Sequence, residues 1–233
     1  MDKYIITHKN FDESKFEDDY TILTNKHDLK FSHNVQYFEG LDDRLWSEIA
    51  AYKWLADNLK DEGWLSLNHY RRKLDRDLTD RICVATPMVL PGPVWQHYAQ
   101  CHNPDDLRLI CDIVKEKTPV MVPALERALN GNILVPYTIG VFNHSVFRDY
   151  TNFLYTVLDE FLKRIGVSTY EEMLKHVDDD KYRGKLDNRP EYQARVVSFL
   201  SERLATAYWN RCTELGMPIF PCNVALLEEN QTI

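Results

Sequence analysis

The chain has 233 residues, of which 44% are hydrophobic and 27% charged, and its 36 acidic and 28 basic residues give a formal net charge of -8. This composition excludes an intrinsically disordered protein, because there are enough apolar side chains to form a core. The acidic balance argues against broad nonspecific binding to nucleic acid or to an anionic membrane, since both are polyanions. It does not exclude a small basic pocket within an acidic surface.

The sequence also bears on localisation and redox state. No apolar run approaches the roughly 20 residues that span a bilayer, and the N-terminal segment lacks the basic and apolar parts of a signal peptide. We therefore expect a cytoplasmic protein with no stable membrane insertion. The cysteines are odd in number and form no C-x-x-C pair, which favours reduced, packed thiols over disulfides or a zinc site; they are Cys83, Cys101, Cys111, Cys212 and Cys222.

The first half of the chain alternates between strand and helix patterns. An apolar run predicts a strand over residues 3–7, and residues 10–40 are turn-rich and predicted as a long loop. Apolar spacings of three and four predict an amphipathic helix over 45–59, capped by Asp42 or Asp43, and a buried strand follows at 64–68. Two further short strands are predicted at 82–85 and 88–90.

Helix patterns dominate the rest. Asn103 as the cap and Pro104 at the first helical position predict a helix that ends before Pro119. A strand region is expected at 133–142, then a long helix up to Gly166, a capping box at Ser168 and Glu171, and a last helix over 190–216. The order predicts an α/β sheet with a mainly helical C-terminal half.

In open α/β sheets, ligands bind beyond the carboxyl ends of the strands. This rule selects two segments, Thr7-His8-Lys9 after the first strand and His69-Tyr70-Arg71-Arg72 after the strand at 64–68. Arginine matches phosphate oxygens with two parallel N–H donors, so the Arg pair predicts a diphosphate site. The alternative is that both arginines form surface ion pairs with Asp75, Asp77 or Asp80.

Four blocks of sequence resemble a domain family that was long labelled as of unknown function, occurs in bacterial capsule and lipopolysaccharide gene clusters and is regarded as glycosyltransferases. The blocks, spread over nearly the whole chain, are Thr7-His8-Lys9; Glu48, Trp54 and Asn58 with His69-Tyr70-Arg71-Arg72; Tyr98, His102, Asp106 and Leu107; and Gln193, Arg195, Phe199, Leu200, Glu202, Arg203 and Leu204. The sequence departs from the family at Ala56-Asp57 and at Thr138-Ile139, where a sugar or an acceptor could be read. The transfer of general activity is therefore safer than that of substrate.

The resemblance implies one glycosyltransferase domain over residues 1–233 with a GT-A-like nucleotide-sugar-binding sheet, residues 1–142 forming the donor-binding α/β part and 143–233 the mainly helical part. Many such enzymes hold a divalent metal with Asp-x-Asp after a central strand, where this sequence has Asn68-His69-Tyr70-Arg71-Arg72. Our hypothesis is that Arg and His replace the metal, so that no cofactor beyond the nucleotide sugar is required. Metal sites at Asp42-Asp43 or Asp178-Asp179-Asp180 are the alternative, although capping and a solvated turn account for these acids. Asp106 and Glu202 are the candidate catalytic bases, and each could instead be a structural helix carboxylate.

Acceptor contacts are assigned to Trp95, which follows a Pro-Gly-Pro segment, and to His102, although both could be structural. The leading hypothesis is transfer of a sugar from a nucleotide sugar to a hydroxyl of a glycan. A hydroxylated base in modified phage DNA is the second acceptor, and a non-catalytic nucleotide-sugar or glycan-binding module is the rival from another class. The sequence does not predict the sugar or the oligomeric state.

Overall fold

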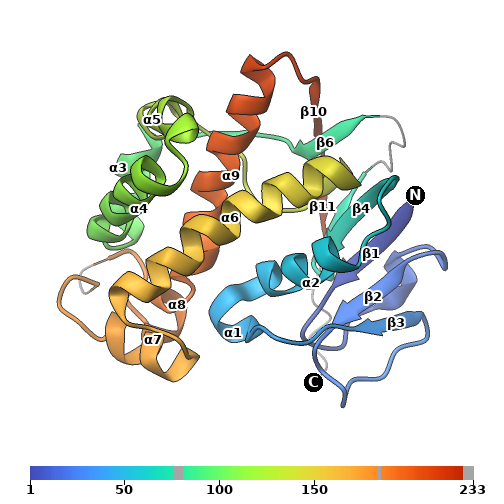
Figure 1. The fold of residues 1–233 in the computed structure, drawn as a ribbon. Helices are drawn as coiled ribbons and strands as arrows, with labels where there is room; N and C mark the ends of the chain where they lie inside the picture. Colours follow the sequence, from blue (N-terminus) through green and yellow to red (C-terminus); the bar gives the residue numbers. More distant parts are fainter. Residues whose placement is uncertain (76–80, 183–184, 228–233) are drawn as a thin grey trace.

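A mixed β-sheet runs through the molecule, and the longer helices pack against one of its faces (Figure 1). The computed structural model describes residues 1–75, 81–182 and 185–227. Within these ranges the main path of the sheet has the order β3 (Asn34–Tyr37), β2 (Thr21–Thr24), β1 (Asp2–Ile6), β4 (Trp64–His69), β9 (Gly140–Asn143), β6 (Ile82–Ala85) and β10 (Ile219–Cys222). Along this path β9 alone runs against its neighbours, so the sheet is mostly parallel.

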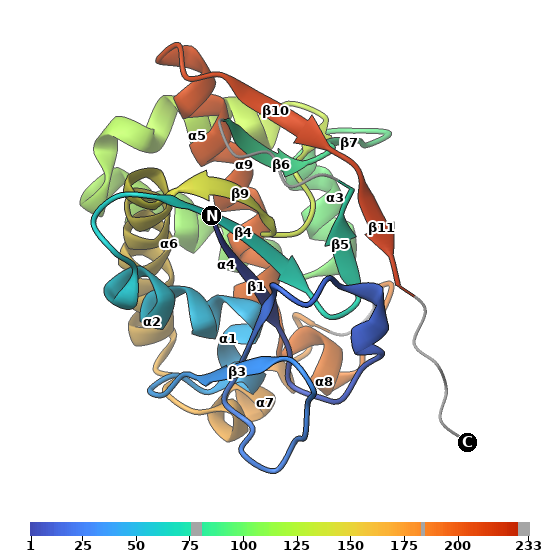
Figure 2. The same ribbon diagram turned by 90° about the vertical axis from the view of Figure 1, so that its right-hand side faces the viewer.

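Two short strands extend the sheet at the carboxyl end of β4 (Figure 2). β5 (Arg72–Leu74) pairs antiparallel with β4, and β11 (Val224–Leu226) pairs antiparallel with β5. A separate two-stranded sheet joins β7 (Met88–Val89) to β8 (Ile133–Leu134). The C-terminal segment therefore returns to the sheet close to the His-Tyr-Arg-Arg turn.

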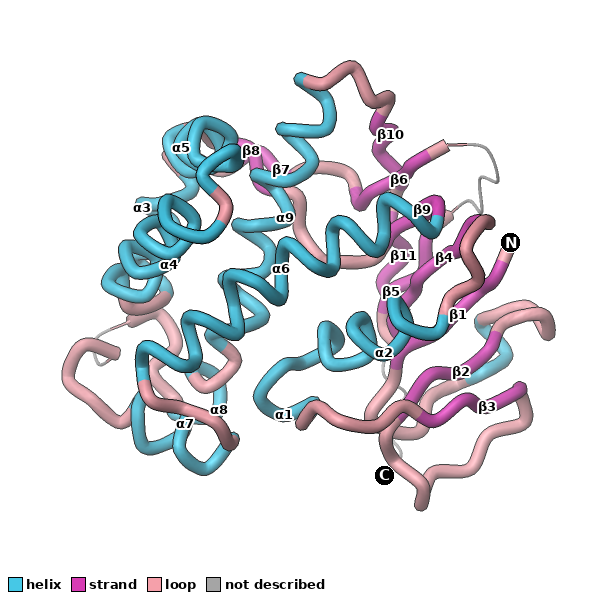
Figure 3. Tube along the Cα trace, in the orientation of Figure 1, coloured by secondary structure: helices cyan, strands magenta, loops and turns pink. Residues whose placement is uncertain are grey.

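Helices fill the other side of the molecule (Figure 3). In chain order they are α1 (Asp43–Trp46), α2 (Ala50–Asn58), α3 (Val94–Cys101), α4 (Pro104–Lys117), α5 (Val122–Asn130), α6 (His144–Ile165), α7 (Tyr170–Val177), α8 (Pro190–Gln193) and α9 (Val196–Glu214), with 3-10 turns at Glu13–Lys15, Ser47–Ile49 and Pro119–Met121. None of the described helices is both long and apolar enough to cross a bilayer.

Alternation along the strands divides the apolar side chains between the two faces of the sheet. Ile6 of β1 joins the large core with α2, α6 and α9, whereas the adjacent Ile5 packs on the opposite face with Phe16 and Tyr20. Phe142 of β9 stacks on Trp209 of α9 with ring centroids 5.4 Å apart, which ties the centre of the sheet to the last long helix.

Several predictions from the sequence are confirmed. The strands expected at 3–7, 64–68 and 82–85 correspond to β1, β4 and β6 within one residue at either end. Asn103 caps α4 by accepting from the Asp105 N–H, Pro104 is its first residue, and Gly166 ends α6 in the left-handed conformation. All five cysteines are free thiols.

Other predictions were wrong in ways that tertiary pairing explains. The segment predicted as a loop over 10–40 holds β2 and β3, whose pairing with β1 and with each other is parallel and cannot be read from local sequence. The predicted helices over 45–59 and 190–216 are interrupted, at Ser47–Ile49 and between α8 and α9, and the strand region at 133–142 splits into β8 and β9. The capping box lies one residue later, with Thr169 and Glu172.

The C-terminal half is mainly helical, as expected, and both parts of the chain contribute strands and helices. β10 and β11 follow α9 and return to the sheet, and helices α3 to α5 precede residue 142.

Gly140 is required by close packing at the centre of the sheet. A Cβ atom there would lie 2.3 Å from Cζ of Phe142 and 2.5 Å from the Cys83 carbonyl oxygen. We expect Gly140→Ala to lower the free energy of unfolding by about 2–3 kcal/mol in a denaturant titration, because neither neighbour can move without disturbing the sheet. Gly92→Ala is the control: its Cβ would meet the flexible end of Gln96 at 3.0 Å, and the change should stay within about 0.5 kcal/mol. Equal stability of the two variants would contradict this account.

Candidate functional site

The carboxyl ends of β1 and β4 lie side by side. These strands are parallel and in register, with Ile6 opposite His69, and the Tyr70 N–H donates to the Ile6 carbonyl at 3.1 Å. The chain leaves β1 for β2 and β3 on one side and later returns to β4 on the other, so this is the point at which strand order reverses. Such a switch point is where open α/β sheets bind their ligands.

A cavity of about 490 Å³ opens at this point, which is within the range of ligand sites. We call it the strand-end cavity. Its lining comes from β1, β4, the turns that follow them, α1, the 3-10 turn after α1, and the start of α7 and α8; the residues are Ile6, Thr7, His8, Lys9, Phe38, Asp43, Arg44, Ser47, Glu48, His69, Tyr70, Arg71, Tyr170, Glu191 and Arg195.

Six of the seven residues predicted to bind the donor line this cavity. They are Thr7, His8, Lys9, His69, Tyr70 and Arg71. The prediction was of adjacency between two basic strand ends, and the structure shows that adjacency. The binding role itself stays a prediction.

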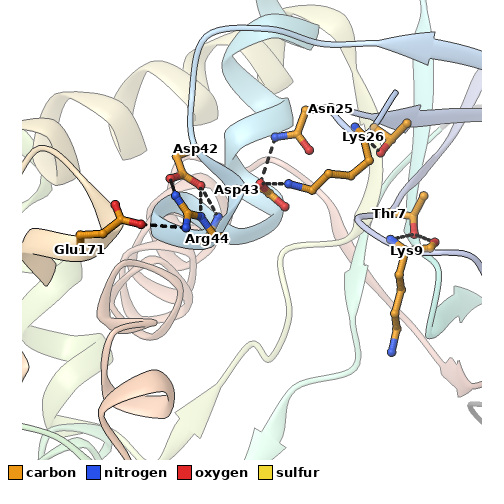
Figure 4. Close-up of polar contacts among 9 residues, drawn as sticks. Thr7, Lys9, Asn25, Lys26, Asp42, Asp43, Arg44 and Glu171 are labelled. Atoms are coloured by element: carbon orange, nitrogen blue, oxygen red, sulfur yellow. Dashed lines mark hydrogen bonds and ion pairs between the residues drawn. The ribbon is translucent and has the colours of Figure 1, made fainter. Parts of the chain in front are cut away.

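The Tyr70 ring holds two cations together. Lys9 Nζ and the Arg71 guanidinium carbon each lie 5.2 Å from its centroid, within the range of a cation–π contact. The turn that carries Lys9 is fixed by Thr7, whose Oγ1 donates to the Lys9 carbonyl at 2.6 Å and accepts from the Lys9 N–H at 3.2 Å (Figure 4). Two positive charges thus lie near one aromatic ring at the carboxyl ends of β1 and β4.

Two neutral imidazoles lie beside these cations. Burial, with the charges of Arg72 and Arg71, lowers the pKa of His69 to about 3 against the opposing effect of Glu48. Its Nδ1 accepts the Arg71 N–H at 3.2 Å, so the ring carries its proton on Nε2 and can donate from there. Burial also lowers the pKa of His8, whose ring meets Tyr70 edge-on.

The α1 side of the cavity is acidic. Asp42 caps α1 and pairs with Arg44, which also reaches Glu171 at 2.9 Å (Figure 4). Asp43 accepts from Asn25 at 3.0 Å and from Lys26 at 2.7 Å. The predicted capping by Asp42 is confirmed, and Asp43 adds a paired carboxylate to the cavity lining.

Glu48 and Arg195 line the cavity but were not among the predicted site residues. Both belong to sequence blocks that resemble the glycosyltransferase family, so a signal for them was present. The breaks that separate Glu48 from α2 and place Arg195 between α8 and α9 were not predicted, because the apolar spacing continues through both. With Lys9, Arg44, Arg71 and Arg195 against Asp43, Glu48 and Glu191, the lining is mixed and has one more cation than acid.

Arg72 and Glu202 lie next to the cavity without lining it. Arg72 stacks on Tyr137 at 4.0 Å from its ring centroid. Glu202 accepts the Tyr137 N–H at 3.1 Å and an Nη1–H of Arg203 at 3.1 Å, and burial raises its pKa. Tyr137 has a positive φ of 60°, unusual for a bulky residue. The predicted catalytic Glu202 thus supports a strained turn behind the cavity.

Of the three acids considered as ion-pair partners of Arg71 and Arg72, the structure describes Asp75. Asp75 accepts from Asn223 at 3.1 Å. Asp77 and Asp80 lie outside the described residues.

The other predicted residues lie among the helices. Asp106 is buried in α4, where both of its carboxylate oxygens lie 3.0 Å from the Tyr182 hydroxyl, and burial raises its pKa to about 7. His102 is buried, stacks on Phe199 at 4.0 Å and has its pKa lowered to about 3 by burial. Neither residue lines the strand-end cavity.

Trp95 was predicted in a loop but lies in the first turn of α3, with 48% of its surface exposed and no place in the cavity lining. The acceptor contacts assigned to Trp95 and His102 therefore stay predictions and do not gather at the strand ends.

The acidic side chains that the sequence offered as metal ligands form other contacts. In the part of the chain that the structure describes, no group of three or more His, Cys, Asp or Glu side chains is arranged to hold a metal ion. Asp43 is engaged with Lys26 and Asn25, and Asp179 accepts from the Lys181 N–H in a turn.

Comparisons with known proteins agree with this fold. A family model described as a domain of unknown function, DUF4422, matches residues 77–179. This segment is less than half of the chain, and of the cavity-lining residues it contains Tyr170. Among curated protein sequences, none gives a significant match.

The apo structure of the bifunctional glycosyltransferase WbbM superposes on the chain with a TM-score of 0.74 at 14% identity. The superposition covers 98% of this chain and 45% of the other, so the chain spans less than half of the length of that protein. At this identity the likeness concerns the fold, and it confirms the expected glycosyltransferase-like α/β architecture.

The buried Asp106 carboxyl makes stability depend on pH. Its pKa is raised from 3.8 unfolded to about 7 folded, so the stability it contributes is greatest below about pH 4 and is lost as the pH rises through 7. Asp106→Asn keeps an acceptor for Tyr182 without the charge. We expect wild type to lose about 2–3 kcal/mol relative to this variant between pH 5 and pH 8, measured by urea unfolding. Asp105→Asn, at the exposed neighbour, retains Asp106 and should differ from wild type by the same amount at pH 5 and pH 8. A pH-independent difference between wild type and Asp106→Asn would refute the assignment.

Proposed function

We propose that the protein is a glycosyltransferase of the GT-A-like class, which moves a sugar from a nucleotide-sugar donor to a hydroxyl acceptor. The observation that carries the proposal is the strand-end cavity, where Lys9 and Arg71 share the Tyr70 ring at the switch point of the sheet. The fold similarity to a glycosyltransferase structure supports it.

The chemistry required at such a site fits these residues. The bond between the anomeric carbon and the diphosphate breaks, and its electron pair leaves with the nucleoside diphosphate. A new bond forms from the acceptor oxygen to that carbon, and the hydroxyl proton passes to a base or to solvent. Lys9, Arg71 and Arg195 supply positive charge for the departing diphosphate, and neutral His69 supplies an N–H donor, so that charge neutralisation comes from the chain itself.

The proposal includes catalytic roles for Asp106 and Glu202, which lie at different distances from the cavity. Glu202 is linked electrostatically to Glu48, which lines the cavity, and it accepts the Tyr137 N–H. Asp106 lies against Tyr182 among the helices, so its contribution would be through structure. A glycan is the preferred acceptor, with Trp95 and His102 as its predicted contacts, and a hydroxylated DNA base is the second.

The cationic group formed by Lys9, Tyr70 and Arg71 gives a direct binding test. We expect Arg71→Ala to weaken binding of a nucleoside diphosphate at least tenfold in isothermal titration with UDP, GDP and dTDP, because a bidentate phosphate contact and its charge are lost. Arg108→Ala is the matched control, since Arg108 is exposed on α4 and pairs with Asp105. Equal affinity of both variants for the diphosphate that wild type binds would contradict a donor site at the strand ends.

Turnover separates the enzyme from a binding module. Wild type incubated with the corresponding nucleotide sugars should slowly release free nucleoside diphosphate by transfer to water. Tight binding with no release, with or without a glycan acceptor, would favour the non-catalytic alternative.

The proposed replacement of a metal by protein cations predicts the effect of chelation. Release of nucleoside diphosphate should proceed at its full rate in excess EDTA, because Lys9, Arg71 and Arg195 supply the positive charge that a divalent ion supplies elsewhere. The measurement compares initial rates with EDTA, with Mg²⁺ and with Mn²⁺ on protein previously stripped of metal. Strict dependence on either ion would rule out the replacement.

A further inference from the structure

Glu48 directly follows a residue with a strained backbone conformation. Ser47, which precedes it, has φ 53° and ψ -146°, a conformation that residues other than glycine avoid. Both sides of this point are fixed by Tyr155 of α6, whose ring stacks on Trp46 at 4.9 Å and whose hydroxyl donates to the Ile49 carbonyl. The strain ends α1 early and brings Glu48 into the cavity lining. Strained residues of this kind cluster at functional sites.

The carboxylate of Glu48 has capacity for a ligand. Arg72 and Arg195 are the positively charged groups near it, His69 is a further electrostatic neighbour, and its own backbone N–H lies close. In the described part of the chain, no lysine or arginine nitrogen lies within 4 Å of its oxygens, and no side-chain donor forms a hydrogen bond to them. A carboxylate can accept about four hydrogen bonds, so Glu48 has acceptor capacity beyond the contact with its own backbone N–H.

Glu48 and Glu202 differ in electrostatic environment although their charges interact. Burial raises the pKa of both, but at Glu48 the neighbouring His69, Arg72 and Arg195 more than offset it and the pKa is lowered. At Glu202 burial prevails and the pKa is raised. Glu48 is therefore the carboxylate that faces the cavity in its ionised form, whereas Glu202 lies behind it on Tyr137.

The lining divides into two chemically distinct parts. Lys9 and Arg71 on Tyr70 favour an anion, whereas the ionised Glu48 repels phosphate and favours hydroxyl donors. His69 lines the cavity as Glu48 does, is its electrostatic neighbour, and in its neutral form offers an Nε2–H donor to a sugar oxygen. A ligand with a diphosphate at one end and a polyhydroxyl group at the other matches this division.

We infer that Glu48 binds a hydroxyl group of the transferred sugar in the strand-end cavity. The inference rests on the proposed function and adds a carbohydrate subsite beside the diphosphate subsite. It assigns sugar recognition to the strained turn between α1 and α2, which the strand-end rule does not select.

The test compares Glu48→Gln with Glu126→Gln, a change at an exposed carboxylate of α5 that lies outside the cavity lining. Affinities are measured by isothermal titration for UDP, GDP or dTDP, whichever wild type binds, and for the nucleotide sugars of that base. Glu48→Gln should weaken binding of the best nucleotide sugar at least tenfold and leave affinity for the free diphosphate unchanged or higher, because a charge-assisted hydrogen bond and a repulsive charge are both removed. Glu126→Gln should change neither affinity more than about twofold.

Binding of the free diphosphate reports whether the variant is folded at the cavity. If Glu48→Gln binds nucleotide sugar and diphosphate as wild type does, or loses both in proportion, the sugar subsite is wrong while the proposed function stands. If wild type binds neither diphosphates nor nucleotide sugars, the proposed function fails and the subsite fails with it.

Discussion

The parallel pairing of β1 with β4 is the constraint on which the candidate site depends. The register that places Ile6 opposite His69 brings together two segments more than 60 residues apart in sequence, and the Tyr70 N–H to the Ile6 carbonyl continues that pairing into the turn. Leu227 donates its N–H to the Arg71 carbonyl at 2.9 Å, so the C-terminal segment fixes the same turn from the other side. A one-residue slip would turn every side chain of β4 to the other face and separate the two cations.

Charge is distributed unevenly over this frame. The net charge of -8 describes the whole chain, whereas the strand-end cavity has one more cation than acid. Two of the acids in the lining differ in their surroundings. Asp43 forms an ion pair with Lys26, whereas Glu48 has Arg72 and Arg195 as electrostatic neighbours without a direct ion pair among the described residues. The chain as a whole is therefore acidic, whereas the cavity lining contains both positive and negative side chains. The positions of these side chains, more than the net charge of the chain, bear on which ligands fit the cavity.

Much of the fold and part of the site could be predicted from local sequence. Apolar runs and caps located β1, β4, β6, α4 and α6, and the rule that ligands bind beyond strand ends selected six residues that do share a cavity. Local sequence could not predict β2, β3, β10 and β11, because their stability comes from pairing with strands distant in the chain. It also could not predict the break at Ser47, because the apolar periodicity passes through it and the strain is imposed by Tyr155 from α6.

Local sequence also could not predict which glutamate lines the cavity. Glu202 was predicted as a site residue and does not line it, whereas Glu48 was not predicted and does. Both occur in blocks that resemble the glycosyltransferase family, and on a helix each could be a simple ion-pair partner. The fold separates them: Glu202 accepts from the Tyr137 N–H and from Arg203, whereas Glu48 lines the cavity. The segment matched by the family model, residues 77–179, contains α3 to α7, the strands β6 to β9, and only Tyr170 of the described lining. Similarity in that segment therefore bears on the scaffold beside the cavity, whereas the strand ends and the strained turn before Glu48 lie outside it.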